Sequence, residues 1–386
     1  MDGQPAEAVF AERFVVQRAH APCGDVGAAL STIADQLGTE PFCLIAFFAS
    51  SDTALEELAV ASRAMFPGVA IIGCTTAGEI SPDGYTSNEI VAVALPSEHF
   101  STHVTIIDDL DNLDQQAVAA DLMSARAEQA HGHPDWENEF AFLMVDGLSI
   151  REDQLSSVLS SALGPTPFFG GSAGDNLKFE RTFVLAGGRV LSHAAVVALV
   201  RTRCPIVTFR LDHLKPTEVK MVVTGADPER RVVTEINAEP AAREYARILG
   251  KDPEQLSRLL FASHPVLVRI GGEHHVRAIR EVLPNGDLVF FSAIDEGLVL
   301  TVAEPMDITD HLAQSLARLS RDSVPDTIIA CDCTLRRVEV EQTQATGAMS
   351  RLLAANRVVG FNTYGEQSNG AHVNQTLTGV AIYPPD

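Results

Sequence analysis

The residues Val69-Ala-Ile-Ile-Gly-Cys-Thr-Thr-Ala-Gly-Glu-Ile80 join a short apolar run to a glycine-spaced loop that carries a carboxylate, Glu79. The same pattern returns at residues 358–367 with no gap. The matching positions are Gly73 and Gly360, Thr76 and Thr363, Gly78 and Gly365, Glu79 and Glu366. A third copy, one residue shorter, lies at residues 168–176 and carries Asp175. Three copies of one local pattern predict an internal repeat.

The sequence around each copy predicts a strand, a helix and a second strand. Apolar runs at residues 42–49, 140–145 and 327–331 have the composition of strands that are buried on both faces. A helical stretch follows each run, and in the middle copy Ser149 and Glu152 have the spacing of a capping box. Parallel strands need such a crossover. We therefore predict an α/β fold with repeated strand–helix–strand–glycine-loop units in two domains with mixed sheets.

The length of 386 residues exceeds one typical core, so at least two domains are expected. We predict an N-terminal leader or edge element at residues 1–39 and a first domain at residues 40–225 that holds two units. A second domain at residues 226–386 would end with the third unit, at residues 326–386. The pair Asn285-Gly286, between two apolar runs, predicts a hairpin in the part of this domain that lacks the repeat.

The composition is acidic, with 28 basic and 51 acidic residues, so the formal charge is 28 − 51 = −23. An acidic surface repels phosphate backbones, which makes nucleic acid an unexpected partner. No apolar run approaches the ~18 residues that cross a bilayer, so no membrane insertion is expected. The six cysteines lie partly within apolar runs and the N-terminus lacks a secretory signal pattern. These features indicate a reduced, cytoplasmic protein.

The repeated loops have the frame of a phosphate-binding loop but not its chemistry. Gly73 and Gly78 match that frame, yet Glu79 stands where a lysine would meet the phosphates. A carboxylate repels phosphate, so the loops are not predicted to bind nucleotides. They place threonine and carboxylate side chains at strand ends, where open α/β sheets bind ligands. A second polar cluster, at residues 364–376, lies between two apolar strands and either is exposed or lines a cavity.

Three motifs resemble the signatures of FIST N and FIST C domains: residues 73–80 (GCTTAGEI), 169–175 (FGGSAGD) and 360–366 (GFNTYGE) with the later Asn374-Gln-Thr-Leu. The resemblance extends from about residue 40 to the end. It implies that residues 40–225 form a FIST N domain and residues 226–386 a FIST C domain. FIST modules are sensory domains of bacterial signal transduction. The resemblance therefore implies a stand-alone sensor that is not an enzyme and acts on a separate partner.

Within that family the chain resembles the haem-binding, nitric-oxide-sensing members. This resemblance implies non-covalent haem b, nitric oxide as the gaseous ligand, and regulation of a partner histidine kinase and of biofilm formation. The family pattern places histidine directly before Asn-Gln-Thr, whereas Val373 separates His372 from Asn374 here. A shift of one place on a strand turns a side chain to the other face. His372 is therefore the first choice as axial ligand, with His193 and His264 as reserves.

Two alternatives stay open beside the haem hypothesis. One is a sensor of an amino acid or another small metabolite, and the other is an enzyme that uses the loop carboxylates. The oligomeric state is also open, with a homo-oligomer as one option. The residues predicted to form a ligand pocket are Thr76, Glu79, Asp175, Thr363, Tyr364, Glu366, Asn374 and Thr376.

Overall fold

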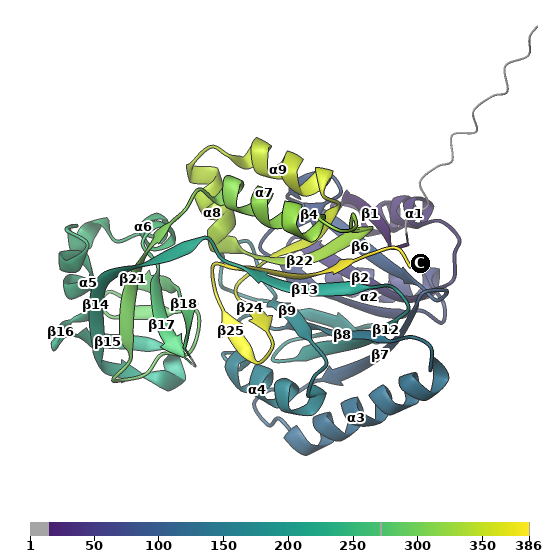
Figure 1. Ribbon diagram of the computed structural model, residues 1–386, viewed down its shortest axis with the longest axis horizontal. Coiled ribbons are helices and arrows are strands. Elements are labelled where there is room, and N and C mark those ends of the chain that lie inside the picture. Colours follow the sequence, from purple (N-terminus) through teal and green to yellow (C-terminus); the bar gives the residue numbers. More distant parts are fainter. Residues whose placement is uncertain (1–14, 271, 386) are drawn as a thin grey trace, which may run out of the picture.

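The computed structural model describes residues 15–270 and 272–385, and it confirms the α/β class (Figure 1). Across these residues the strands form four sheets, three of six strands and one of eight. The three six-stranded sheets build a main body, which comprises residues 15–213 and 306–385. The fourth sheet builds a small body, residues 214–305, at the left of Figure 1.

The main body contains three units with one order of elements: strand, helix, strand, helix, strand, hairpin, strand. In the third unit two helices take the place of the second helix. The first comprises β1 (Gln17–Pro22), α1 (Val26–Leu37), β2 (Phe42–Ser50), α2 (Leu55–Met65), β3 (Ala70–Thr76), β4 (Glu79–Ser81), β5 (Gly84–Thr86) and β6 (Glu89–Pro96). The second comprises β7 (Phe100–Ile107), α3 (Gln115–Gly132), β8 (Asn138–Val145), α4 (Glu152–Leu163), β9 (Phe168–Ser172), β10 (Val184–Ala186), β11 (Arg189–Leu191) and β12 (Ala195–Thr202).

The third unit is interrupted by the small body, which is inserted between its first strand and its first helix. The unit comprises β13 (Ile206–Leu211), α7 (Ile308–Leu319), β22 (Thr327–Cys333), α8 (Thr334–Gln342), α9 (Thr346–Ala355), β23 (Val358–Thr363), β24 (Glu366–Ser368), β25 (Ala371–Val373) and β26 (Leu377–Ile382). The insertion comprises β14 (Leu214–Asp227), β15 (Val232–Ile236), β16 (Glu239–Pro240), α5 (Ala241–Ile248), α6 (Arg258–Ser263), β17 (Val266–Ile270), β18 (Glu273–Arg277), β19 (Ile279–Val282), β20 (Leu288–Phe290) and β21 (Val299–Pro305).

The three units exchange their hairpins in a cycle. Hairpin β4–β5 of the first unit pairs with β23 of the third, β10–β11 of the second pairs with β3 of the first, and β24–β25 of the third pairs with β9 of the second. In each of the three six-stranded sheets the two central strands run parallel, as β2 and β3 do, and the flanking strands run antiparallel. The exchange ties units that lie far apart in the sequence into one body.

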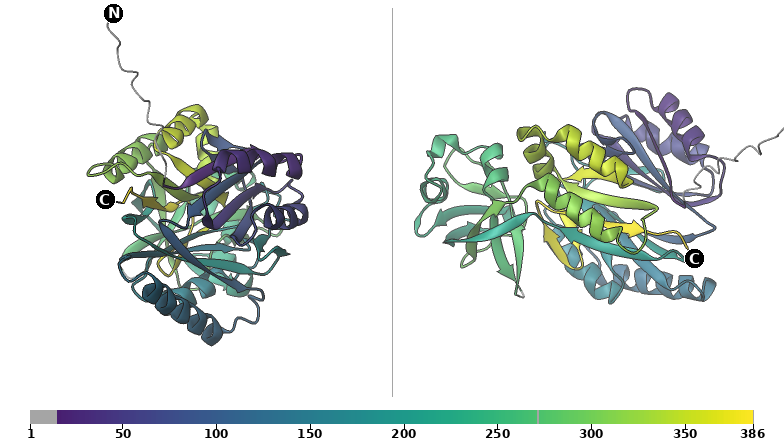
Figure 2. Two further views of the ribbon diagram at one scale, coloured as in Figure 1. Left: turned by 90° about the vertical axis from the view of Figure 1, so that its right-hand side faces the viewer. Right: turned by 45° about the horizontal axis from the view of Figure 1, so that its top comes forward.

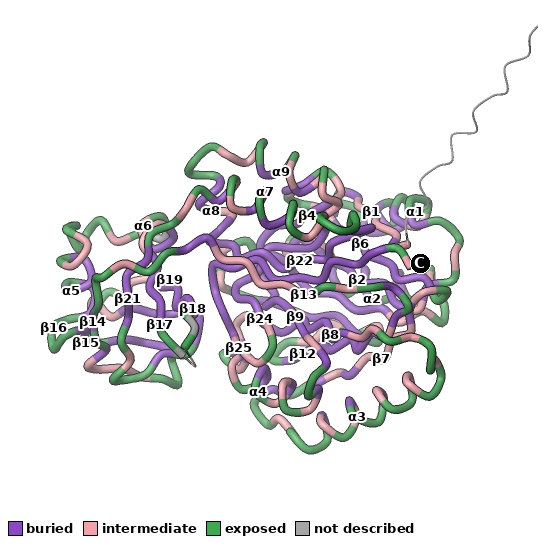
Figure 3. The backbone as a smooth tube through the Cα atoms, viewed as in Figure 1, coloured by how far each residue is buried: buried purple, intermediate pink, exposed green. Residues whose placement is uncertain are grey.

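The inner faces of the three sheets share one core, and helices cover their outer faces (Figure 2, left). The central cluster takes phenylalanine and valine side chains from all three sheets. Three outer clusters lie under α1 and α2, under α3 and α4, and under α7 and α9. The strands are therefore buried on both sides while the helices expose one face (Figure 3). This burial explains why the strands have continuous apolar sequences rather than alternating ones.

The spatial grouping of the chain differs from the predicted linear division. The third unit begins with β13, and its sheet contains strands β4 and β5 of the first unit. The boundary predicted at 225/226 falls inside β14, and the assignment of residues to two linear domains stays a prediction. Within the predicted leader, residues 15–39 hold the edge strand β1 and helix α1, while residues 1–14 lie outside the described residues.

Two local predictions have different outcomes. The hairpin at Asn285-Gly286 is confirmed, because β19 pairs with β20 across it and Gly286 has a φ of 88°. The capping box is wrong, because Arg151 is the N-cap of α4 and the Ser149 hydroxyl donates to the Asp146 carbonyl. Glu152 is directed to the small body instead. Among the helices of the described residues, none has the length and apolar character to cross a membrane.

Candidate functional site

The predicted pocket residues all lie where the loops of the three units meet, at the end of the main body that faces the small body. The Gly174 N–H donates to the Thr75 carbonyl at 3.0 Å, and the Tyr364 N–H donates to the Ser172 carbonyl at 3.1 Å. A methyl group at Gly174 would lie 2.7 Å from the Ala77 Cβ. Each side chain of the predicted set is buried, with at most 3% exposed. The structure thus brings these residues together, although they come from three units.

The two loop glutamates accept hydrogen bonds from residues beside their own hairpins, and neither lines the cavity at the junction. The Thr76 hydroxyl donates to Glu79 Oε1 at 2.5 Å, and the backbone N–H of Glu89 donates to Oε2 at 3.3 Å. Glu366 accepts from the Thr363 hydroxyl and from both the N–H and the hydroxyl of Thr376, the latter at 3.2 and 2.7 Å. Burial raises the pKa of Glu79 to about 7 and that of Glu366 to about 8, although these donors oppose the shift.

Replacing Glu366 with glutamine is expected to flatten the pH dependence of stability above pH 5. A raised carboxyl pKa means that the folded protein holds a proton which the unfolded chain releases between about pH 4.5 and 8. The contribution of this carboxyl group to wild-type stability is therefore fully present at low pH. It declines as pH rises through this window, by at most ~1.4 kcal/mol per pH unit. Urea unfolding at pH 5 and pH 9 measures the decline. The exposed Glu56→Gln is the control. An unchanged slope in Glu366→Gln would contradict the assignment.

Asp175 and Tyr364 fix a loop with an unusual backbone. Asp175 accepts hydrogen bonds from the backbone N–H groups of residues 179–181 at 2.7 to 2.9 Å. It also accepts one from the Tyr364 hydroxyl. Burial alone would raise the pKa of Asp175, but these donors outweigh it and lower the pKa. Leu177 and Phe179 in this loop have φ values of 62° and 54°. Large side chains rarely adopt such backbone angles, and strained residues cluster at functional sites.

A cavity of about 40 Å³ lies beside this loop, between the main body and the small body. Of the residues predicted from the sequence, only Tyr364 lines it. Its wall is partly aromatic, and its charged side chains are arginines. Three of its lining residues, Ile150, Phe179 and Arg231, have φ values between 54° and 60°. The full lining is Gly147, Leu148, Ile150, Phe179, Arg230, Arg231, Arg280, Phe290, Phe291 and Tyr364.

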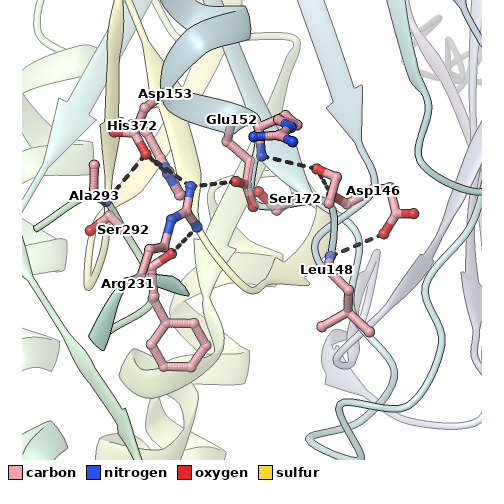
Figure 4. A network of polar contacts seen from close by, with 12 residues as sticks. Asp146, Leu148, Glu152, Asp153, Ser172, Arg231, Ser292, Ala293 and His372 are labelled. Carbon is pink, nitrogen blue, oxygen red and sulfur yellow. Dashed lines mark hydrogen bonds and ion pairs between the residues drawn. The ribbon is translucent and has the colours of Figure 1, made fainter. Parts of the chain in front are cut away.

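Arg231 joins this cavity to a buried polar network that holds the two bodies together (Figure 4). Its Nη2 donates to Glu152 at 2.7 Å and to Asp153 at 2.9 Å, and its Nη1 donates to the Phe291 carbonyl. The same Asp153 oxygen, Oδ2, also accepts from the Ala293 N–H at 3.2 Å and lies 3.3 Å from Nδ1 of His372. Glu152 and Asp153 belong to α4 of the main body, so the network spans the junction.

His372 lies in this network with its second nitrogen unpaired. Nε2 of His372, Nδ2 of Asn374 and Nε of Arg277 are buried and make no hydrogen bond within the described residues. A methyl group at Gly365 would lie 2.1 Å from His372 Nε2 and 3.2 Å from Asn374 Nδ2, so two of these atoms adjoin one glycine. Because buried polar atoms normally find partners, this cluster indicates a place where a ligand or water completes the site.

The surroundings of His372 do not fit a haem in this geometry. A haem iron and its porphyrin need open space in front of the ligating nitrogen, whereas the backbone of Gly365 packs directly against Nε2. His372 lines none of five cavities of about 40 to 610 Å³ in the described parts of the chain. The reserves line none of them either. His193 is 60% exposed beside Asp111, and His264 Nδ1 lies 2.9 Å from the Ser263 hydroxyl.

Apart from Tyr364, the residues that form the wall of the cavity were not predicted from the sequence. Arg231 and Arg280 come from the small body and Phe179 from the loop after β9, and none belongs to the repeated motif. The only available signal was Glu152, which was interpreted as a capping residue although its carboxylate holds Arg231. Such pairs, 79 residues apart, carry no local pattern.

Comparison with known proteins agrees with the sensory interpretation of this architecture. The FIST N domain model matches residues 43–239, and the FIST C domain model matches residues 241–369. An uncharacterized protein of Methanocaldococcus jannaschii is 24% identical over 252 residues, which cover 60% of this chain and 48% of that protein. The match thus spans about half the length of this relative. The chain belongs to the FIST family of sensory signal-transduction proteins and carries a FIST N domain followed by a FIST C domain.

Proposed function

We propose that this protein is a sensor of a small metabolite, that the metabolite binds at the junction of the main body and the small body, and that binding changes how the two bodies are held. The observation that supports this proposal most directly is the cavity, because its wall is complete only when both bodies are present. Small-molecule sites occur preferentially at such interfaces, with an apolar wall and a few polar groups.

The connection between the bodies permits such a response. The chain enters the small body at residues 212–213 and leaves it at residues 306–307, and the Met306 N–H donates to the His213 carbonyl at 2.7 Å. Two adjacent linkers of this kind form a hinge, since a few residues at the ends of elements absorb the change in φ and ψ. A ligand that binds the closed arrangement better than the open one shifts the population toward it.

The junction combines an apolar cluster, to which Phe291 of the small body and Tyr364 of the main body belong, with hydrogen bonds that a ligand can redistribute. Besides the Arg231 network, the Ser292 hydroxyl donates to Asn374 at 2.6 Å, and the Gln375 amide donates to the Ala262 carbonyl at 2.8 Å. Arg277 donates to the His372 carbonyl at 3.2 Å. Interfaces between domains of one chain generally resemble transient protein interfaces, so relative motion is the default expectation.

Equilibrium dialysis against a metabolite library, read by mass spectrometry, tests the proposal. At least one compound is expected to be retained and to raise the melting temperature by a few degrees, since ligand at 100-fold Kd contributes ~2.7 kcal/mol. The shift is expected to disappear in Phe179→Ala, which opens the cavity wall, and to persist in the control Met123→Ala, whose side chain is exposed on α3. Equal shifts in both variants would place the ligand elsewhere.

The partner in this proposal is a separate histidine kinase, and the protein acts in the cytoplasm without catalysing a reaction. Kinase autophosphorylation with and without the retained metabolite measures the output. The enzyme alternative has less support, because Glu79, Asp175 and Glu366 are each held by hydrogen-bond donors and none of them lines the junction cavity. Turnover that is lost in Glu79→Gln would favour the enzyme.

Haem and nitric oxide form a second proposal, favoured by the unpaired Nε2 of buried His372. It requires the segment around Gly365 to move away from that nitrogen. An absorption spectrum after reconstitution with haem b tests it. A Soret band that shifts on addition of nitric oxide and changes in His372→Ala would support this function. No band, or a band insensitive to His372→Ala, would rule out this histidine as the ligand.

A further inference from the structure

We propose, on the basis of the metabolite-sensing function above, that the junction cavity binds the carboxylate of an organic acid without an ammonium group, and that Arg280 is the residue that selects it. The cavity adjoins apolar side chains from both bodies, and its charged lining residues are Arg230, Arg231 and Arg280. Among the described residues its wall includes no carboxylate. The guanidinium groups on this wall favour an anion inside the cavity, although Glu152, Asp153 and Glu281 pair with two of them from outside the lining.

The three arginines differ in how far their charge is already compensated. Arg231 has two carboxylates within 2.9 Å and a side chain only 7% exposed, so it holds the junction. Arg230 is 70% exposed, and its nearest carboxylate, Asp227, is 3.9 Å away. Arg280 is 28% exposed and uses Nε and Nη2 to bind one oxygen of Glu281. A guanidinium has five N–H groups, so Arg280 retains donors for a ligand.

Arg280 is also held in place, which a selective residue requires. Its guanidinium carbon lies 5.6 Å from the centroid of the Phe179 ring. That ring contacts the Tyr364 ring at 4.5 Å and the Phe291 ring at 5.8 Å between centroids. A planar guanidinium fixed on an aromatic face presents paired N–H groups to a carboxylate in defined geometry. Phe291 and Tyr364 are buried, whereas Phe179 is half-buried and leaves apolar surface for the hydrocarbon part of the ligand.

The size and polarity of the cavity set the rest of the specificity. A volume of about 40 Å³ is comparable to one or two water molecules, so it accepts a carboxylate head group while the hydrocarbon part lies against the half-buried Phe179 side chain. An α-ammonium group would need an acceptor inside the cavity, but among the described residues no carboxylate lines it. The neighbouring Asp175 carboxylate already accepts from Tyr364 and three backbone N–H groups, and Glu281 lies outside the lining, where it accepts from Arg280. Burying an unpaired ammonium is unfavourable, so an amino acid is expected to bind less well than the matching simple acid.

Isothermal titration calorimetry with two matched sets of compounds tests this inference on the full chain. The sets are propanoate, propanamide and L-alanine, and 3-phenylpropanoate, 3-phenylpropanamide and L-phenylalanine, with inorganic phosphate as a further anion. At least one carboxylate is expected to bind, and its amide, its amino acid and phosphate to bind at least about tenfold more weakly. An amide or amino acid that binds as tightly as the acid would overturn the proposed class. Tighter binding of phosphate would do the same.

Substitution of Arg280 identifies the selecting residue. Arg280→Gln is expected to weaken binding of the carboxylate at least about tenfold and to leave binding of the amide unchanged, which a merely structural role would not produce. Arg280→Lys is expected to restore part of the affinity, because it keeps the charge and loses the planar fork. Arg243→Gln, an exposed position on α5 of the same body, is the control. Equal loss for acid and amide in Arg280→Gln would overturn the selecting role.

The failure of this inference can be told apart from failure of the proposed function. If the metabolite library yields a ligand that lacks a carboxylate and still requires Phe179, the sensor function stands and the anion class is wrong. If a carboxylate binds but neither Phe179→Ala nor Arg280→Gln weakens it, both the junction site and the selecting role fail. If neither the library nor the matched compounds yield a ligand, the metabolite-sensing function itself fails.

Discussion

Replacing Arg336 with methionine is expected to lower the free energy of unfolding by about 3–5 kcal/mol, because it leaves a buried aspartate without its charged partner. Arg336 is 1% exposed and Asp332 is fully buried, and the Arg336 Nε atom donates to Asp332 Oδ1 at 2.7 Å. The Tyr85 hydroxyl donates to the other oxygen of Asp332. Tyr85 and the Asn362 amide, which lies 3.5 Å from the same oxygen, are neutral donors and do not replace a guanidinium in a medium of low dielectric constant.

The same arginine supports the linker between the two bodies. Its Nη1 donates to Nδ1 of His213 at 2.9 Å, so His213 carries its proton on Nε2, which lies 2.9 Å from Glu339. His213 is fully buried at the entry to the small body. Loss of Arg336 is therefore expected to loosen the hinge as well as to destabilise the fold, and hydrogen exchange at residues 211–214 measures that second effect.

Urea unfolding of three variants isolates the buried charge. The double variant Asp332→Asn/Arg336→Met removes both charges and is expected to be more stable than Arg336→Met alone. Arg151→Met is the control, because Arg151 and Asp111 are both more than 40% exposed and such pairs contribute less than ~1 kcal/mol. A double variant no more stable than the single one would show that packing of the arginine, not its charge, dominates.

Replacing Gly360 with alanine is expected to cost about 3 kcal/mol or more and to reduce the yield of folded protein. Gly360 has a φ of 153°, and its added methyl group would lie 1.8 Å from the carbonyl oxygen of Ala330. That oxygen belongs to the neighbouring parallel strand, where Ala330 pairs with Gly360, so no side chain can rotate to relieve the contact. Strand β23 also carries the exchanged hairpin β4–β5 of the first unit.

Gly24→Ala provides the matched control, since a methyl group there meets no atom within 4 Å. Its stability is expected to equal that of the wild type to within ~0.5 kcal/mol. Urea unfolding and the fraction of soluble protein measure both variants. A Gly360→Ala protein as stable as Gly24→Ala would contradict the close approach of β22 and β23.

Much of the main body could be predicted from local patterns. The runs that became β2, β8 and β22 and the crossover helices after them were recognisable because continuous apolar sequence and 3.6-residue spacing arise from burial of one element at a time. The turn at Asn285-Gly286 depends on two residues alone and was equally visible. The predicted loop residues were also brought together, because each follows the carboxyl end of a buried strand.

Other features had no local signal. The exchange of hairpins puts Glu79 beside Phe361 and Glu366 beside Gly171, and both pairings span about 200 or more residues of sequence. The loop glutamates were predicted to face a ligand, yet each bonds its own threonine because the exchanged hairpin turns it inward. Glu152 was predicted to cap α4, yet it pairs with Arg231, a partner that exists only after the small body docks.

The sequence by itself determined the α/β class and the apolar runs that form the central strands, since these depend on each residue and its near neighbours along the chain. Only the tertiary structure decided which hairpin joins which sheet and that Arg280, Phe179 and Tyr364 share one wall. Those outcomes minimise exposed apolar surface and unpaired charge over the whole chain, and such a balance is set by contacts between distant residues. The candidate site belongs to this second class, because two bodies must meet before it exists.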